Sequence, residues 1–294
     1  MGDIFTRIRR LFSRGNILSQ FIFINVGVFI AIRLGMVLLT LFEMDGARFL
    51  EYVQMPSSPA LLLYRPWTVI TYMFLHVDLL HILFNMLWLY WFGGIFLRFF
   101  SGRQLGGLYV AGGIAGAILF MLAYNVFPYF RNLAGHSMLM GASASVMAIV
   151  FAVSFCQKNY EINLLLVGKV KLIYLALFTL VVDLLSITSS NAGGHIAHLG
   201  GALFGILFAG QLKHGKDITV SINRWIDRLV NLRKRKRRPH MKVTYRRPES
   251  DMDYNARKRE DMDALDAILE KLKRSGYDSL SADEKKRLFD ASRK

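Results

Sequence analysis

The sequence has one cysteine, and its 37 lysines and arginines outnumber 21 acidic residues. The single thiol, Cys156, excludes an intramolecular disulfide and offers no cysteine framework for a metal ion. Charge is also scarce in the middle of the chain, where the stretch between about residue 17 and residue 212 holds nearly all of the apolar runs. The formal net charge of +16 is therefore a property of the two ends.

Hydrophobic residues make up 53% of the chain, and a soluble domain of this length rarely carries so much apolar mass. The arginines near the N-terminus precede a long apolar run without a small-residue cleavage site, so this run is interpreted as a retained first span. The runs are long enough to cross a bilayer, which predicts an all-α, polytopic membrane protein. Six spans are expected, at residues 18–42, 78–98, 105–127, 142–157, 170–187 and 194–212.

The basic residues between these spans predict the orientation. Most of them fall on one side, together with the N-terminal arginines and the region Lys213–Lys216, whereas the other side has only Arg48, Arg65 and Arg131 in longer loops. Because positive loops stay in the cytoplasm, both termini are expected there, as an even number of spans requires. A bacterial inner membrane is the expected location.

Four regions are expected: a basic N-terminus at 1–17, the membrane domain at 18–212, a basic linker at 213–257 and a small helical hairpin at 258–294. The linker contains six consecutive basic residues, Arg233–Arg238, which predict attraction to anionic lipid headgroups. A retention signal without a ligand is the alternative. A nucleic-acid site is disfavoured because no aromatic residues interleave the run.

The last segment has a helical pattern of apolar residues that ends at Gly276, a residue typical of a helix C-terminus. Ser281 and Glu284 then predict a capping box that opens a second short helix. The pair of helices is expected to form a hairpin that docks a cytoplasmic partner. It carries no residues that indicate chemistry.

Polar side chains inside the spans need a reason, because burying them in a membrane is costly. His81 and Asn85 are four residues apart and share a helical face, with His76 just before them. Two N–H donors on one face suit stabilisation of an oxyanion. Hydrogen bonding between helices would explain the same residues without catalysis.

Two further motifs combine small residues with a reactive group. Ser143 follows Gly141-Ala142 at the start of the fourth span, where a helix N-terminus favours developing negative charge, although small residues there also serve packing. In the sixth span, Gly201 and Gly205 form a face for close helix contact, and His198 lies one turn earlier, aimed at the same neighbour. His198 and Ser143 could therefore form a base–nucleophile pair. His195 is interpreted as a supporting or entrance residue.

The three motifs together resemble the rhomboid family of intramembrane proteases. The resemblance covers about residues 17–212 and implies a six-span bundle with a long lateral first loop. The matching positions are His76, His81 and Asn85 for H-x4-H-x3-N, Gly141 to Ser143 for G-x-S, and Ala197, His198, Gly201 and Gly205 for A-H-x2-G-x3-G.

The resemblance implies a Ser–His dyad without a carboxylate, and no metal or cofactor. Ser143 would attack the scissile carbonyl and His198 would transfer the proton to the leaving amine. The oxyanion would lie among the Ser143 N–H, His81 and Asn85, with Gly141, His76, Gly201 and Gly205 in support. Substrates would be single-span membrane proteins, and water would reach the site between the loops Gly135–Met140 and Ser186–Gly194.

Three positions depart from the family pattern: Ala144 replaces a glycine, Met147 a tyrosine, and Leu97 a glutamate. Ala144 is expected to narrow the pocket. A second hypothesis is therefore a catalytically silent protein that binds and escorts transmembrane helices. A haem or metal protein, using the histidines at 76, 81, 195 and 198, is less favoured because the small-residue face predicts tight contact. No span has the polar stripe of a pore.

Overall fold

The computed structural model describes residues 16–164, 168–232 and 251–292, and most of them are helical. The chain divides into two compact units, Met1–Arg235 and Lys236–Lys294. Two small two-stranded sheets are the exceptions to the expected all-α fold in the described residues.

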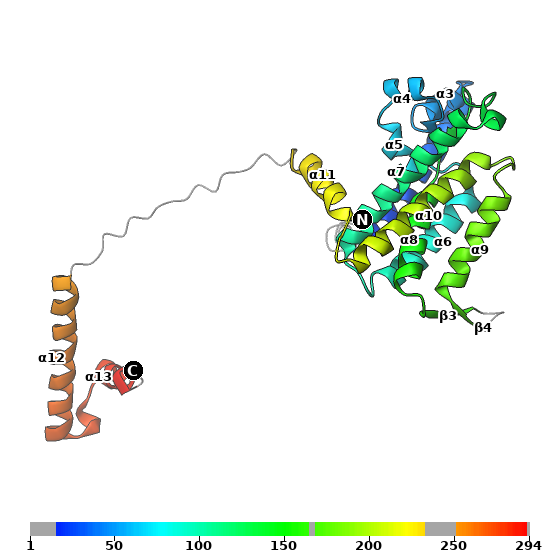
Figure 1. The fold of residues 1–294 in the computed structure, drawn as a ribbon. Helices are drawn as coiled ribbons and strands as arrows, with labels where there is room; N and C mark the ends of the chain where they lie inside the picture. The colour runs from blue at the N-terminus through cyan, green and yellow to red at the C-terminus, as the bar shows by residue number, and fades with distance from the viewer. Residues whose placement is uncertain (1–15, 165–167, 233–250, 293–294) are drawn as a thin grey trace. The chain divides into compact units, whose positions relative to one another are not determined.

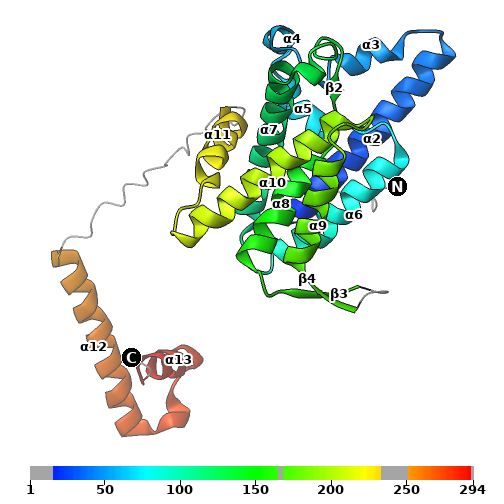
Figure 2. The same ribbon diagram turned by 45° about the vertical axis from the view of Figure 1, so that its right-hand side comes forward.

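The first unit contains six apolar helices of at least 14 residues, and each coincides within a few residues with a predicted span (Figures 1 and 2). Their bounds are α2 (Ile17–Leu41), α6 (Leu79–Phe96), α7 (Gly102–Val126), α8 (Ser143–Cys156), α9 (Leu172–Leu185) and α10 (Ala192–Lys213). Four of them, α2, α6, α7 and α10, are long and apolar enough to cross a membrane. The other two have 14 residues each, about 21 Å of helix, whereas the hydrocarbon core is about 30 Å thick.

Local capping explains where these helices begin. The side chain of Asn16 accepts the Leu18 N–H at 2.7 Å and opens α2. Asp78 does the same for α6 by accepting the His81 N–H at 2.8 Å. Ser101 and Gln104 form a reciprocal capping box at α7. Each cap satisfies a backbone donor that the first turn leaves without a partner in the helix.

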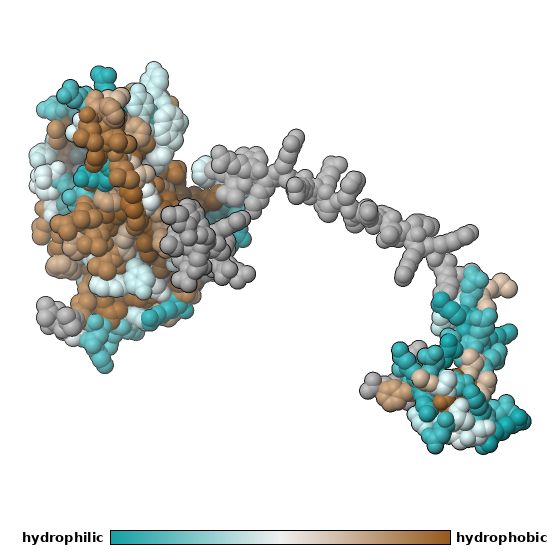
Figure 3. Space-filling model, turned by 180° about the vertical axis from the view of Figure 1, so that it is seen from behind, coloured by the Kyte–Doolittle hydropathy of each residue, from teal (hydrophilic) through white to brown (hydrophobic). Residues whose placement is uncertain are grey.

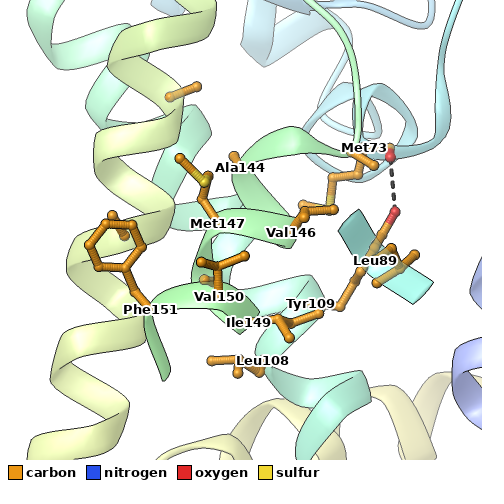
Figure 4. Packing of buried hydrophobic residues seen from close by; sticks show 14 of the residues in the cluster. Met73, Leu89, Leu108, Tyr109, Ala144, Val146, Met147, Ile149, Val150 and Phe151 are labelled. Carbon is orange, nitrogen blue, oxygen red and sulfur yellow. Dashed lines mark hydrogen bonds between the residues drawn. The ribbon is translucent and has the colours of Figure 1, made fainter. Parts of the chain in front are cut away.

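The long segment between α2 and α6 folds into short elements held against the bundle. They are α3 (Gly46–Glu51), β1 (Met55–Pro56), α4 (Pro59–Tyr64), α5 (Thr68–Thr71) and η1 (Tyr72–Phe74). The Tyr72 hydroxyl donates to the Gly113 carbonyl at 2.5 Å. The Tyr109 hydroxyl donates to the Met73 carbonyl at 3.0 Å (Figure 4). These bonds fix the end of the segment on α7, just ahead of the predicted oxyanion residues.

Three connections complete the first unit. The 3-10 turn η2 (Pro128–Phe130) follows α7, and β2 (Met138–Leu139) then pairs antiparallel with β1. Before α9, β3 (Glu161–Leu164) and β4 (Gly168–Lys171) pair as an antiparallel hairpin.

Helix α8 packs against both α7 and α10, which also pack against each other (Figures 1 and 2). A Cβ atom on Gly201 would collide with the Ala144 carbonyl, and one on Gly205 with the Ala148 carbonyl. From the other side, a Cβ on Gly116 would lie 2.5 Å from the Ala144 methyl. The predicted small-residue face of the sixth span is therefore confirmed, and its partner is the helix that carries Ser143.

The region expected as a linker, residues 213–257, contains a helix that was not predicted, α11 (Thr219–Leu232). Its residues Ile222 and Ile226 pack against the bundle, and Trp225 beside them is 49% exposed. Asp227 forms an ion pair with Arg103 at the start of α7. The spacing of its apolar residues is helical, but the many basic residues of this region favoured the prediction of a linker. The basic run Arg233–Arg238 lies outside the described residues.

The second unit consists of α12 (Asp251–Ser275), η3 (Tyr277–Ser279) and α13 (Ala282–Ser292). Helix α12 ends at Gly276, which has a φ of 74°, and it begins seven residues before the predicted boundary at 258. The capping box is confirmed, because Glu284 accepts the Ser281 N–H at 2.7 Å and the Ser281 hydroxyl accepts the Glu284 N–H. The Ser281 N–H, followed by Lys271, lowers the pKa of Glu284.

The surfaces of the two units differ in character (Figure 3). Apolar side chains such as Leu34, Phe84 and Leu185 are exposed on the first unit, where a bilayer would cover them. The surface of the second unit is largely hydrophilic (Figure 3). Among its described residues, the buried apolar ones are Ile268 and Leu280. The helical pattern of apolar residues predicted for α12 is only partly buried, since Ile268 is buried whereas Leu269 is 37% exposed.

Candidate active site

A cavity of about 370 Å³ brings together the four residues predicted to carry the chemistry. Ser143 comes from α8, His198 from α10, and His81 and Asn85 from α6. The remaining lining residues are Phe84, Trp88, Met140, Val146, Met147, Phe178, Thr179, Val182, Asp183, Asn191 and Gly194. Most of these are apolar, so the four polar groups face a space with few competing hydrogen-bond partners.

Ser143 is the first residue of α8, and the preceding Ala142 provides no side-chain cap. The first helical bond at this end runs from the Val146 N–H to the Ala142 carbonyl, so the N–H of Ser143 has no partner inside the helix. Ser145 points elsewhere: it is 1% exposed, does not line the cavity, and its Oγ lies 2.7 Å from a Cβ built on Gly113. The structure thus separates Ser143, which lines the cavity, from Ser145, which does not.

Gly141 shapes the turn that presents Ser143. Its φ is +117°, a conformation that residues with a Cβ rarely adopt. A Cβ there would lie 2.8 Å from Cε1 and 2.9 Å from Nε2 of His81. Glycine is therefore needed both for the backbone angle and for the imidazole that lies against it, as its predicted supporting role requires.

His76 supports the same turn from behind. Its Nε2 accepts the Ala142 N–H at 3.3 Å, and its side chain is fully buried. Burial, followed by the charge of His81, lowers the pKa of His76 to about 4. The ring therefore stays neutral near pH 7, which keeps the Nε2 lone pair available for this bond.

Asn85 lies one turn after His81 and is 7% exposed. Its Nδ2 donates one N–H to the His81 carbonyl at 2.9 Å. A side-chain amide has two such donors, so the second remains for a group in the cavity. His81 and Asn85 thus present donors on the same wall, as their spacing predicts.

His198 contacts a carboxylate that the sequence analysis missed. Asp183 of α9 accepts from Nδ1 of His198 at 2.9 Å and from Nδ1 of His195 at 2.8 Å, both through Oδ1. The Asp183 side chain is 6% exposed. The resemblance implied a Ser–His pair without a carboxylate, whereas in the structure His198 is hydrogen-bonded to one. The sequence did contain a clue: Asp183 is the only acidic residue of the predicted fifth span, and an ionisable group inside a span usually has a function.

Asp183, His195 and His198 also form a group that could hold a metal ion, with ligand atoms within 4.8 Å of one another. The N–O distances of 2.8 and 2.9 Å are those of hydrogen bonds. Ligands around a tetrahedral metal at about 2.0–2.1 Å would be roughly 3.3 Å apart. The arrangement therefore fits a hydrogen-bonded carboxylate better than a metal centre.

Comparison with known proteins identifies the membrane part. Residues 64–214, half of the chain, match the rhomboid domain. The chain belongs to the rhomboid family. A relative, "RHOMBOID-like protein 12, mitochondrial" of Arabidopsis thaliana, is 30% identical over 162 residues, which cover 52% of this chain and 48% of the relative. The chain thus spans about half the length of this curated rhomboid. Residues 249–294 match a family of unknown function, DUF6576.

Membership in the rhomboid family and the apolar helices make the chain an integral membrane protein. The departures from the rhomboid pattern can now be located. The Ala144 methyl faces Gly116 of α7 and does not line the cavity, so the expected narrowing of the pocket does not occur. Met147 does line it. Leu97 is the C-cap residue of α6, at the far end from His81.

The two loops predicted to frame water access meet at a second cavity of about 400 Å³. The first loop contributes Ser137 to Met140 to its lining. The second loop contributes Ser190, Asn191, Gly193 and Gly194. His81, Met140, Asn191 and Gly194 line both cavities. The two spaces are therefore adjacent, with His81 between them.

Proposed function

We propose that this rhomboid protein is an intramembrane serine endopeptidase that cleaves transmembrane segments of single-span membrane proteins. The observation that carries the proposal is the single cavity in which Ser143, His198, His81 and Asn85 converge from three helices. These are the nucleophile, base and oxyanion donors that acyl transfer requires. No cofactor takes part in this mechanism.

In the proposed reaction, Ser143 Oγ attacks the scissile carbonyl while Nε2 of His198 takes the hydroxyl proton. The carbonyl oxygen becomes an oxyanion, which the Ser143 N–H, His81 and Asn85 stabilise. When the C–N bond breaks, His198 gives its proton to the leaving amine and an acyl-enzyme remains. Water then attacks the ester by the same route in reverse. One well-placed oxyanion donor contributes about 3 kcal/mol to such a transition state.

The membrane arrangement belongs to the same proposal. The helices α8 and α9, which are short and apolar, cross as the fourth and fifth of six spans. Both ends of the chain lie in the cytoplasm, and α12 and α13 form a hairpin that docks a cytoplasmic partner. A bacterial inner membrane is proposed on the sequence alone, and the similar Arabidopsis protein is named as mitochondrial.

The proposal predicts that a fluorophosphonate probe labels Ser143 in the detergent-solubilised protein. The serine must be activated and reachable for this reaction, and it lines the cavity. Mass spectrometry would locate the adduct, and cleavage of a single-span test substrate would be measured in parallel. If neither labelling nor cleavage occurs, the protease proposal is overturned, and binding of transmembrane helices without cleavage becomes the function to test.

A separate prediction concerns the basic run Arg233–Arg238. Six charges at about 1 kcal/mol each near an anionic surface should hold the linker at the membrane. A dye on Ser250→Cys, in a Cys156→Ser background, should be quenched by nitroxide headgroups more strongly in anionic than in zwitterionic nanodiscs. Replacing all six residues by glutamine should remove the difference, and replacing basic residues 285–287 of α13 should not. Equal quenching in both lipids contradicts the prediction.

A further inference from the structure

Asp183 is the acidic residue of α9, a helix that is otherwise apolar. Its carboxylate is buried, and a buried charge without partners is costly. In the structure, its Oδ1 accepts from the Nδ1 atoms of both His195 and His198. The two histidines are three residues apart on α10, so one helical face presents both rings to α9.

This contact determines which nitrogen of each imidazole carries the proton. An ionised carboxylate only accepts hydrogen bonds, so Nδ1 of His198 must be protonated when the ring is neutral. The lone pair then lies on Nε2, the nitrogen that is left for the Ser143 hydroxyl in the shared cavity. The ring is thus held in the tautomer that a general base needs.

We infer that Asp183 is a positioning residue that orients His198 and fixes its reactive tautomer, while His195 bonds to the same carboxylate oxygen. The inference rests on the proposed function for its catalytic consequence. The proton of Ser143 goes to Nε2 of His198, and no proton is transferred to Asp183. When the imidazolium forms, the carboxylate faces a cation instead of a neutral ring.

The test begins with the tautomer, which is independent of proteolysis. Long-range 15N–1H NMR of histidine-labelled full-length protein in detergent distinguishes Nδ1–H from Nε2–H rings. In the native protein, His198 should be in the Nδ1–H form near pH 7. In Asp183→Asn, whose amide also offers N–H donors, a mixture or the opposite tautomer is expected. A native His198 in the Nε2–H form overturns the inference, whether or not the protein cleaves a substrate.

Cleavage kinetics give the second readout. Asp183→Asn should lower kcat/KM by about 100-fold, mainly in kcat, because a well-oriented general base contributes about 10²–10⁴-fold. Asp183→Glu, which retains the charge, should recover part of the loss. His195→Gln should cost less than Asp183→Asn, because one of the two contacts to the carboxylate remains. Thermal melting of each variant would identify any that fails to fold.

The pH profile separates positioning from a general loss of structure. The titratable groups facing His198, among the described residues, are Asp183 from α9, His81 from α6 and His195 on its own helix. Loss of the anion should move the acidic limb of the kcat/KM profile of Asp183→Asn to lower pH.

The outcomes distinguish a failure of the inference from a failure of the proposed function. If the native protein cleaves and Asp183→Asn keeps full kcat and the same pH profile, the inference is contradicted but the proposed function is intact. A protein that neither cleaves nor labels, but holds His198 as Nδ1–H, fails the proposed function while the positioning contact stands.

Discussion

Ser143→Ala is expected to abolish cleavage of a single-span substrate, whereas Ser145→Ala should cleave at close to the native rate. Ser143 lines the cavity with His198, and Ser145 is buried against Gly113 of α7. In a serine protease, loss of the nucleophile costs about 10⁶-fold in kcat, and a loss of at least about 10⁴-fold is expected here. His198→Ala should be equally damaging, because the pair acts as a unit.

The measurement is initial-rate cleavage in liposomes of native protein and the three variants at equal amounts. The double variant Ser143→Ala/His198→Ala should be no worse than either single variant, as for residues that act together. Product formation by Ser143→Ala, or its loss in Ser145→Ala with an unchanged melting temperature, would show that the nucleophile is wrongly assigned. The two serines are only two residues apart, so this pair is the matched control.

Gly201→Ala is expected to unfold the bundle at lower temperature and to lower activity, while Gly210→Ala on the same helix should not destabilise it. A Cβ on Gly201 would collide with the Ala144 carbonyl, so α10 would have to move away from α8. Overpacking of this kind costs about 1–3 kcal/mol. Nothing lies within 4 Å of a Cβ on Gly210, and an alanine at an open helical position is favoured by about 0.5–1 kcal/mol.

Thermal melting in detergent, followed by cleavage at a temperature where both variants are folded, would check this pair. The melting temperature should fall in Gly201→Ala and not in Gly210→Ala. A general intolerance of alanine in α10 would instead lower both melting temperatures. Activity should fall further than stability alone explains in Gly201→Ala, because Ala144 is next to Ser143 and His198 is one turn from Gly201. A Gly201→Ala protein as stable and active as Gly210→Ala would contradict the tight contact.

Much of the helical framework could be predicted from local patterns. The apolar runs located α2 and the five helices α6 to α10, because burial in a bilayer requires long uncharged segments. Ser281 and Glu284 predicted the start of α13, and Gly276 the end of α12, because capping depends on side chains a few residues apart. The helix α11 was missed although its isoleucines recur at helical spacing, since charge dominated the interpretation of that region.

The residues of the candidate site could also be predicted from the sequence, one motif at a time. The sequence determined which side chains share a helical face: His81 with Asn85, and His198 with Gly201. It did not determine how these faces meet. The direction of the Ala144 methyl and the burial of Ser145 depend on glycines of α7, which lies before α8 in the chain and packs against its far side.

Asp183 marks the limit most clearly. Its position in a predicted span was visible in the sequence, but its partners, His195 and His198, are on another helix. The periodicity of a helix fixes which way a side chain points, whereas the distance between two helices depends on the residues packed between them. The sequence by itself thus determined the helices, their caps and the faces with reactive groups. Only the tertiary structure, through the close glycine contacts of α10 with α8, decided that a carboxylate from α9 reaches the histidine beside Ser143.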